Sequence, residues 1–211
     1  QLTENPATRP LLQPLLADPP EWWDRFFAYA ARNATQSEPV VFLYQNRNRN
    51  GDLPSADEQR AYLNRLWQEN RWLEAYLAWL NGLDEQQTKV LGYLYNGSFE
   101  APITQLGFDW RMSSPRGVTV ETIETYGARG DKALHVSFNG ERVRFQHVFQ
   151  YLFLDAGLYR LQGRARTDSF KTERGLRWRM RCVGASALLA ESEPFVGSDE
   201  WRNFVVDFTV P

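Results

Sequence analysis

The stretch YLYNGSFEAPITQLGFDWRM, residues 93–112, marks a change in the pattern of apolar residues along the chain. Before it, apolar residues recur every three or four positions, which is typical of amphipathic helices. From Phe108 onward, apolar and polar residues alternate, which is typical of strands with one buried face. The Asn-Gly pair at 96–97 supplies the backbone freedom that such a join needs. The sequence therefore predicts an α+β protein with a helical first half and a β second half.

The composition is that of a folded globular chain. Of its 211 residues, 43% are hydrophobic and 14% are aromatic, which is enough for a substantial core. The formal net charge of -2 gives no overall attraction to nucleic acid or to a membrane surface, and no apolar run approaches the ~18 residues of a membrane span. Cys182 is the single cysteine, so no intrachain disulfide forms, and we expect a buried apolar role for it. The chain begins with Gln1, so we expect a processed or excised piece of a longer product.

The helical patterns lie in residues 18–95, after a Pro- and Leu-rich segment at 1–17 that we expect to be an extended leader. Ser55 and Glu58 have the spacing of a capping box, in which the two side chains bind free backbone amides at a helix start. Asp84 and Gln87 have the same spacing, so we expect another helix there that reaches Tyr95. We expect a polar loop at QNRNRNG, residues 45–51.

The segment AYLNRLWQENRWLEAYLAWLNGL, residues 61–83, resembles a tetratricopeptide repeat. Trp72, Glu74, Ala75 and Leu83 fall where the packing residues of that repeat lie. The resemblance covers about two helical hairpins, the first of them degenerate, and implies a surface for protein partners. Because such repeats are stable only when stacked, we expect either further repeats or docking on the second half.

The alternating pattern continues through residues 96–211 in about eight or nine short segments separated by Gly-containing turns, which predicts an antiparallel β-sandwich. The motifs NGSFE, GDKALHVSF, GLYRLQGRART and FTVP occur in the order found in galactose-binding-like jelly rolls, which they resemble. Many carbohydrate-binding modules have this fold, so the resemblance implies a glycan ligand. Members usually continue with one more strand after FTVP, so we expect the last strand to be missing. A helical hairpin followed by such a jelly roll also resembles bacterial proteins of exopolysaccharide production, which implies an extracytoplasmic location, in the periplasm or cell envelope.

Basic residues outnumber acidic ones between residues 157 and 182. The alternation places several arginines on one face of two consecutive strands. They are Arg164 and Arg166 on the first strand and Arg177, Arg179 and Arg181 on the second. If these strands pair with each other, the arginines form one patch suited to the carboxylates of an acidic glycan. The alternative is a solvated sheet face balanced by acidic residues on neighbouring strands. Trp201 has the parity opposite to the apolar residues of its strand, so we expect it to be exposed, where it can stack on a sugar.

Three other features of the sequence are candidate sites. The jelly-roll resemblance implies that Glu100 helps to bind a structural calcium with Asp131 or Asp207, and a solvated glutamate is the alternative, since calcium needs six or more oxygens. Neither His135 nor His147 has a second ligand at metal-binding spacing. Asn96 in NGS matches an N-glycosylation acceptor, for which a simple turn is the alternative.

No nucleophile, phosphate-loop or dinucleotide motif occurs in the sequence. We therefore expect a non-enzymatic protein whose helical part contacts proteins and whose β part binds a polysaccharide or oligosaccharide, acidic or neutral. No nucleic acid ligand is expected, because aromatic residues do not interleave with the basic face. One alternative is a pure protein scaffold with a non-binding sandwich. Another is a glycan hydrolase, which would need two carboxylates facing each other across a cleft.

Overall fold

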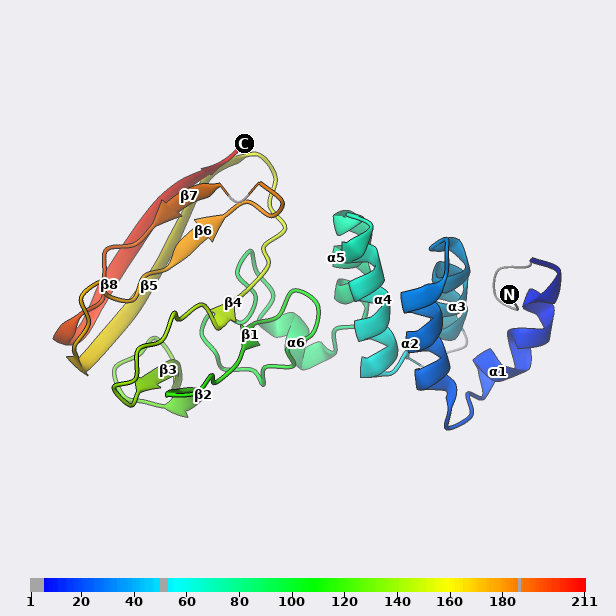
Figure 1. Ribbon diagram of the computed structural model, residues 1–211, viewed down its shortest axis with the longest axis horizontal. Helices are drawn as coiled ribbons and strands as arrows, with labels where there is room; N and C mark the ends of the chain where they lie inside the picture. The colour runs from blue at the N-terminus through cyan, green and yellow to red at the C-terminus, as the bar shows by residue number, and fades with distance from the viewer. Residues whose placement is uncertain (1–5, 50–52, 186) are drawn as a thin grey trace. The chain divides into compact units, whose positions relative to one another are not determined.

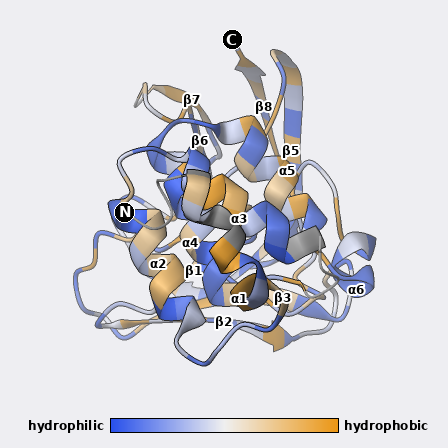
Figure 2. Cartoon of the chain, turned by 90° about the vertical axis from the view of Figure 1, so that its right-hand side faces the viewer, coloured by the Kyte–Doolittle hydropathy of each residue, from blue (hydrophilic) through white to orange (hydrophobic). Residues whose placement is uncertain are grey.

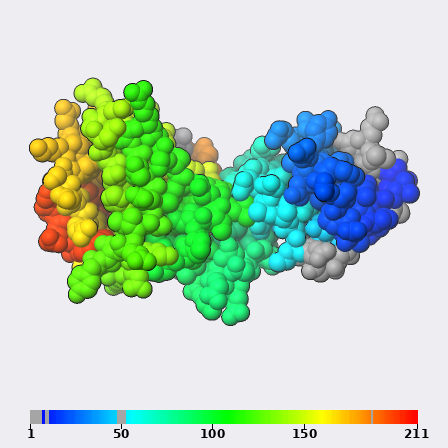
Figure 3. Space-filling model, turned by 90° about the horizontal axis from the view of Figure 1, so that it is seen from below, coloured from blue at the N-terminus to red at the C-terminus, as the bar shows by residue number. Residues whose placement is uncertain are grey.

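The computed structural model describes residues 6–49, 53–185 and 187–211, and the remaining residues are drawn in grey (Figures 1 and 3). These residues form six α-helices and one 3-10 helix, followed by eight β-strands. The predicted α+β class is therefore confirmed. The chain divides into two compact units, and the division is not a single cut. The first unit contains Gln1–Asn96, Ala101–Ser113 and Phe145–Phe153, and the second contains Gly97–Glu100, Ser114–Arg144 and Leu154–Pro211.

The first unit is helical, with one short pair of strands (Figure 1). Its elements are η1 (Pro6–Leu12), α1 (Gln13–Ala17), α2 (Trp23–Asn33), α3 (Glu38–Arg49), α4 (Ala56–Gln68), α5 (Trp72–Asn81), α6 (Glu85–Lys89), β1 (Arg111–Met112) and β4 (Val148–Phe149). The strands β1 and β4 pair antiparallel. Among the described residues, no helix is both long and apolar enough to cross a membrane.

The N-terminal segment is helical, and the prediction of an extended leader at 1–17 is wrong for its described part. Residues 6–17 form η1 and α1, while residues 1–5 lie outside the described residues. Leu12 and Leu16 are buried in the core of the helical unit. Packing of these two leucines against the core stabilises a helical conformation that the Pro-rich composition does not favour.

Both predicted capping boxes are present. Ser55 Oγ accepts from the backbone N–H of Glu58, whose carboxylate in turn accepts from the Ser55 N–H, and Asp84 and Gln87 make the equivalent pair. The helix that follows Asp84 is shorter than expected, because α6 ends at Lys89 and does not reach Tyr95. The described part of the polar loop predicted at 45–51 is helical as well, since α3 continues to Arg49.

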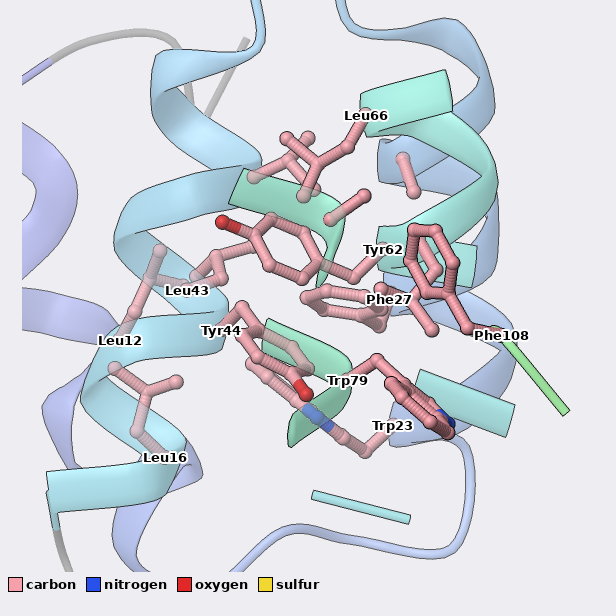
Figure 4. Close-up of a cluster of buried hydrophobic side chains, with 14 of the residues drawn as sticks. Leu12, Leu16, Trp23, Phe27, Leu43, Tyr44, Tyr62, Leu66, Trp79 and Phe108 are labelled. Carbon is pink, nitrogen blue, oxygen red and sulfur yellow. The ribbon is translucent and has the colours of Figure 1, made fainter. Parts of the chain in front are cut away.

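The core of the first unit is rich in aromatic residues. Figure 4 shows side chains from η1 and from α1 to α5 gathered in one cluster, together with Phe108, which follows the last helix in the chain. Tyr44 and Tyr62 stack with their ring centroids 4.0 Å apart. In Figure 2 the helices carry both hydrophobic and hydrophilic residues, as expected for helices with one buried face. Trp23, Phe27, Tyr44, Tyr62 and Trp79 are the aromatic core residues contributed by these helices.

A pair of buried charges lies inside this core. The Glu58 side chain is 1% exposed, and its Oε1 accepts hydrogen bonds from Trp23 Nε1 at 2.6 Å and Arg47 Nε at 3.3 Å. Arg47 Nη1 also donates to the carbonyl oxygen of Leu16 at 3.0 Å. A buried charge is tolerable only when it is paired and hydrogen-bonded. Glu58 therefore caps α4 and binds α2 and α3, and Arg47 in turn binds α1.

Asn96 organises the seam between helices and strands. It is 1% exposed and has the left-handed φ of 46° that asparagine tolerates better than most residues. Its side-chain amide donates to the carbonyl of Ala101 and accepts from the Ala101 N–H, while its own carbonyl accepts from Trp110 Nε1. The alternative of a turn is therefore the better explanation of NGS, because the asparagine amide is buried and hydrogen-bonded on both sides.

The second unit is built from three antiparallel strand pairs. They are β2 (Val118–Glu124) with β3 (Lys132–Phe138), β5 (Gly157–Phe170) with β8 (Gly197–Val210), and β6 (Arg179–Arg181) with β7 (Leu188–Glu191). The two fourteen-residue strands β5 and β8 form the longest ladder and run side by side in Figure 1. The predicted alternation is visible in β5, where exposed and less exposed residues follow each other along most of the strand.

Candidate ligand-binding face

The pairing of the strands separates the predicted arginine patch into two groups. The patch required the strand of Arg164 to pair with the strand of Arg179, but β5 pairs with β8, and β6 pairs with β7. The condition on which one continuous patch depended is therefore not met. Alternation within each strand was read correctly, but the choice of partner strand depends on contacts between residues far apart in the sequence.

The first group lies on the exposed side of the β5–β8 ladder. The register places Asn203 opposite Arg164, and Trp201 lies two residues before Asn203 on the same face of β8. The guanidinium carbon of Arg164 is 5.9 Å from the centre of the Trp201 ring, and that of Arg166 is 5.5 Å away. These distances are within the range of cation–π attraction. The structure thus brings together three of the residues that the sequence singled out.

A β-bulge lies next to this cluster. The ladder runs regularly to the pair Ala165 and Arg202 and resumes at Thr167 and Asp199, so β8 contains one extra residue. A bulge of this kind increases the local twist of a ladder and re-aims its side chains. Trp201 is half-buried, so the prediction of an exposed indole is only partly confirmed.

The loop between β2 and β3 contacts the same cluster. Trp201 Nε1 donates to the carbonyl of Tyr126 at 2.9 Å. Arg164 Nη1 donates to the carbonyl of Gly127 at 2.6 Å, and its Nη2 donates to the carbonyl of Trp201 at 3.3 Å. We call the set Tyr126, Gly127, Arg164, Arg166 and Trp201 the Trp201 face.

Tyr126 is the member of this face that the sequence did not reveal. Its side chain is 96% exposed, although large aromatic side chains are usually at least partly covered. In the sequence, Tyr126 is distinguished only by its position directly before a glycine in a turn. Alternation does not apply inside a turn, so pattern analysis gave no reason to select it.

The charges on the Trp201 face are not balanced by acidic groups. Arg164 uses its guanidinium on backbone carbonyls, and Arg166 makes no hydrogen bond or ion pair with any described residue. Arg160, on the same strand, differs because it forms a two-point pair with Asp207 at 2.6 and 3.1 Å. Those hydrogen bonds lower the pKa of the Asp207 carboxyl, although both groups lie in solvent. Positive charge is therefore available at Arg164 and Arg166 and neutralised at Arg160.

The second group of arginines is paired. Arg177 Nη1 and Arg179 Nε bind the two oxygens of the Glu191 carboxylate at 3.3 and 3.0 Å. Together with Arg174 these side chains line an open groove. This matches the alternative of a sheet face balanced by acids on neighbouring strands. Arg177 and Arg179 are therefore weaker candidates for a ligand than Arg164 and Arg166.

Glu100 acts on the backbone in this structure. Its Oε1 accepts from the N–H groups of Asp131 and Lys132, and Asp207 is held by Arg160. Within the described ranges, no group of three or more His, Cys, Asp or Glu side chains is placed to hold a metal ion. The donor set that the jelly-roll resemblance implied for calcium is thus not assembled at Glu100.

The remaining candidates have ordinary surroundings. His135 on β3 lies 3.3 Å from the Glu121 carboxylate on β2, on the solvated side of that ladder. Cys182 is partly exposed, so the expectation of a fully buried cysteine is wrong. Neither residue belongs to the Trp201 face.

Comparison with known proteins adds no relative to this picture. No protein-family model, curated protein or solved structure gives a significant match to the chain. The function is therefore inferred from the chemistry of the Trp201 face itself. That face offers an indole, an exposed phenol and two guanidinium groups without acidic partners.

Proposed function

We propose that this chain is a non-catalytic protein that binds an acidic oligosaccharide or polysaccharide at the Trp201 face. The observation that carries the proposal is the pair of arginines, Arg164 and Arg166, beside Trp201 without a neutralising carboxylate. A guanidinium binds a carboxylate with two parallel hydrogen bonds. Trp201 adds aromatic surface next to those donors, which suits the apolar faces of a sugar ring, and the exposed Tyr126 lies in the loop that contacts Trp201.

The same proposal assigns a fold family to each of the two units. The ordered motifs of the second half support a diverged galactose-binding-like jelly roll, and the α4–α5 hairpin supports a tetratricopeptide-like first unit. On this basis we place the protein with bacterial exopolysaccharide production or export, outside the cytoplasm. In this scheme the helical unit contacts a protein partner while the second unit binds the polymer.

Calorimetric titration of the whole chain tests the ligand class. The probes are polygalacturonate as the acidic polymer and dextran as the neutral one. We expect polygalacturonate to bind and dextran to bind at least tenfold more weakly, and we expect added salt to weaken the acidic interaction because it screens exposed charges. Absence of binding to both polymers would contradict the proposal. Release of new reducing ends during the incubation would contradict its non-catalytic part.

A matched pair of variants tests the location. Arg166→Ala removes a cation without an acidic partner, and we expect it to weaken polygalacturonate binding by about tenfold or more, because a hydrogen bond to a charged group is worth about 1.5–3 kcal/mol. The control is Arg160→Ala combined with Asp207→Ala, which removes a neutralised pair from the same ladder. We expect the control to bind like the unchanged chain. Equal losses in both variants would argue against a site at Trp201.

A pure protein scaffold is the second candidate, and the exposed surface of α5 favours it. Leu73 and Leu77 are exposed and lie one turn apart, on a different side of the helix from the buried Ala75 and Trp79. An exposed apolar strip of this kind often marks a contact with another protein. If the scaffold is the whole function, neither polymer binds, and replacing Leu73 and Leu77 by serine alters assembly measured by light scattering.

A further inference from the structure

The loop between β2 and β3, residues 125–131, is held at both ends by side chains from outside it. At its start, the carbonyls of Tyr126 and Gly127 accept from Trp201 and Arg164. At its end, backbone N–H groups donate to Glu100. A hydrogen bond from the Thr125 N–H to the Asp131 carbonyl, 2.9 Å long, closes the loop at its base.

Glu100 makes a close-fitting clamp on the far end of this loop. Its Oε1 accepts from Asp131 N at 2.9 Å and from Lys132 N at 3.0 Å, and its own carbonyl accepts from Lys132 Nζ at 3.2 Å. Hydrogen bonds from backbone N–H groups to a carboxylate are about twice as strong as those between neutral groups. A Cβ atom on Gly130 would lie 2.2 Å from the same carboxylate oxygen, so only glycine leaves room for the clamp.

At its other end, the loop packs closely against the Trp201 side chain. Gly127 has a φ of +83°, in the region that favours glycine, and a Cβ there would lie 3.0 Å from Cδ1 of Trp201. The loop backbone therefore lies directly against the indole edge. Because the loop is short and closed at its base, a shift at the Glu100 end is passed to the Trp201 end.

We infer that Glu100 is a positioning residue for the Trp201 face. Its carboxylate holds the loop, and the loop carbonyls in turn fix the indole of Trp201 and the guanidinium of Arg164. This role takes the place of the calcium ligand that the sequence suggested for Glu100. The importance of the clamp for ligand binding rests on the proposed function, but the positioning of Trp201 does not.

The test measures solvent exchange of the Trp201 indole N–H by NMR, with its signal assigned from a Trp201→Phe variant. Glu100→Ala removes the clamp, and we expect the exchange of that N–H to accelerate by about tenfold, which corresponds to about 1.4 kcal/mol of lost protection. Glu100→Gln keeps an acceptor of the same shape and should show a smaller increase. Glu193→Ala removes another exposed acid of this unit and should leave the exchange unchanged.

A second variant keeps the test decisive if Glu100→Ala fails to fold. Gly130→Ala keeps the glutamate but forces its carboxylate and the loop apart, so it should also break the clamp and accelerate exchange at Trp201. Gly157→Ala is the matched control, since a Cβ at Gly157 would lie at an ordinary 3.6 Å from Cε2 of Tyr159. Unchanged exchange at Trp201, while the amides of Asp131 and Lys132 lose protection, would overturn the inference.

The outcome also separates this inference from the proposed function. If exchange accelerates as expected but the unchanged chain binds no polygalacturonate, Glu100 positions Trp201 and the proposed ligand is wrong. If the unchanged chain binds polygalacturonate and Glu100→Ala alters neither the exchange nor the affinity, the ligand proposal stands and the positioning role is wrong.

Discussion

Replacing Arg47 by methionine is expected to destabilise the first unit strongly. The change removes the cation beside Glu58, whose side chain is 1% exposed and whose carboxylate lies 3.3 Å from Arg47 Nε. It also removes the donor to the Leu16 carbonyl. Methionine fills a similar volume, so the loss is mainly electrostatic.

The magnitude follows from what remains around Glu58. Breaking a buried ion pair by removing one partner costs about 3–5 kcal/mol, because a buried charge is left uncompensated. Here the carboxylate keeps the hydrogen bonds from Trp23 Nε1 and from the Ser55 N–H, so we expect the lower end, about 3 kcal/mol. The double variant Arg47→Met with Glu58→Gln removes both charges and keeps an acceptor for Trp23. It should lie within about 1 kcal/mol of the unchanged chain, since neutral replacement of a whole buried pair is often tolerated.

The assay is urea unfolding followed by far-UV circular dichroism. The signal reports on the first unit, because all helices among the described residues belong to it. Lys89→Met is the control, since Lys89 and Glu85 form an exposed pair, and such a pair contributes at most about 1 kcal/mol. A loss below about 1 kcal/mol in Arg47→Met, or a double variant less stable than the single one, would refute the reasoning about the buried pair.

Two further predictions concern the helical core. Burial raises the pKa of Tyr62 to about 12, and burial also raises that of its stacking partner Tyr44. The folded chain thus holds these protons more tightly than the unfolded chain, whose tyrosines ionise near about pH 10. The contribution to stability is therefore complete below that pH and is lost as the pH rises toward about 12. Urea unfolding across this range should show the decline, and a constant midpoint would contradict it. Gly107→Ala should destabilise the unit by about 2 kcal/mol or more, because Gly107 has a φ of +57° and a Cβ there would lie 2.1 Å from Trp79 Cδ1. Thermal unfolding measures the loss, with Gly92→Ala as the control, because a Cβ there would lie 3.6 Å from the Leu94 carbonyl oxygen. Equal melting temperatures for the two variants would contradict this prediction.

Local rules in the sequence predicted local structure well. The capping boxes at Ser55 and Asp84 were predicted because each depends on two side chains three residues apart. The change of period near residue 108 predicted the transition to strands for the same reason, since alternation is a property of neighbouring residues. Parity placed Arg164 and Arg166 on one face of their strand and placed Trp201 opposite the apolar residues of its own strand, and the structure brings these three residues together.

Long-range contacts were not accessible in this way. Arg160 and Asp207 are 47 residues apart, and no local pattern showed that β5 would pair with β8. Glu58 was predicted to cap a helix, but its bond to Trp23, 35 residues earlier, was not. The contact of Trp201 with the Tyr126 carbonyl spans 75 residues and passes through a turn, where side-chain direction follows no period. Arg164, Arg166 and Trp201 were therefore selected as candidates from the sequence, but neither their common ladder nor the loop that contacts it was predicted.

The central claim is that the Trp201 face binds an acidic glycan, and NMR titration of the indole signals tests it most directly. Acidic galacturonate oligomers are added to the isotope-labelled chain, and neutral dextran oligomers serve as the comparison. We predict that the Trp201 indole signal shifts with the acidic oligomers, follows a saturable curve, and shifts much less in Arg166→Ala. A Trp201 signal that stays in place while the acidic oligomers bind, or shifts equally with the neutral ones, would contradict the account.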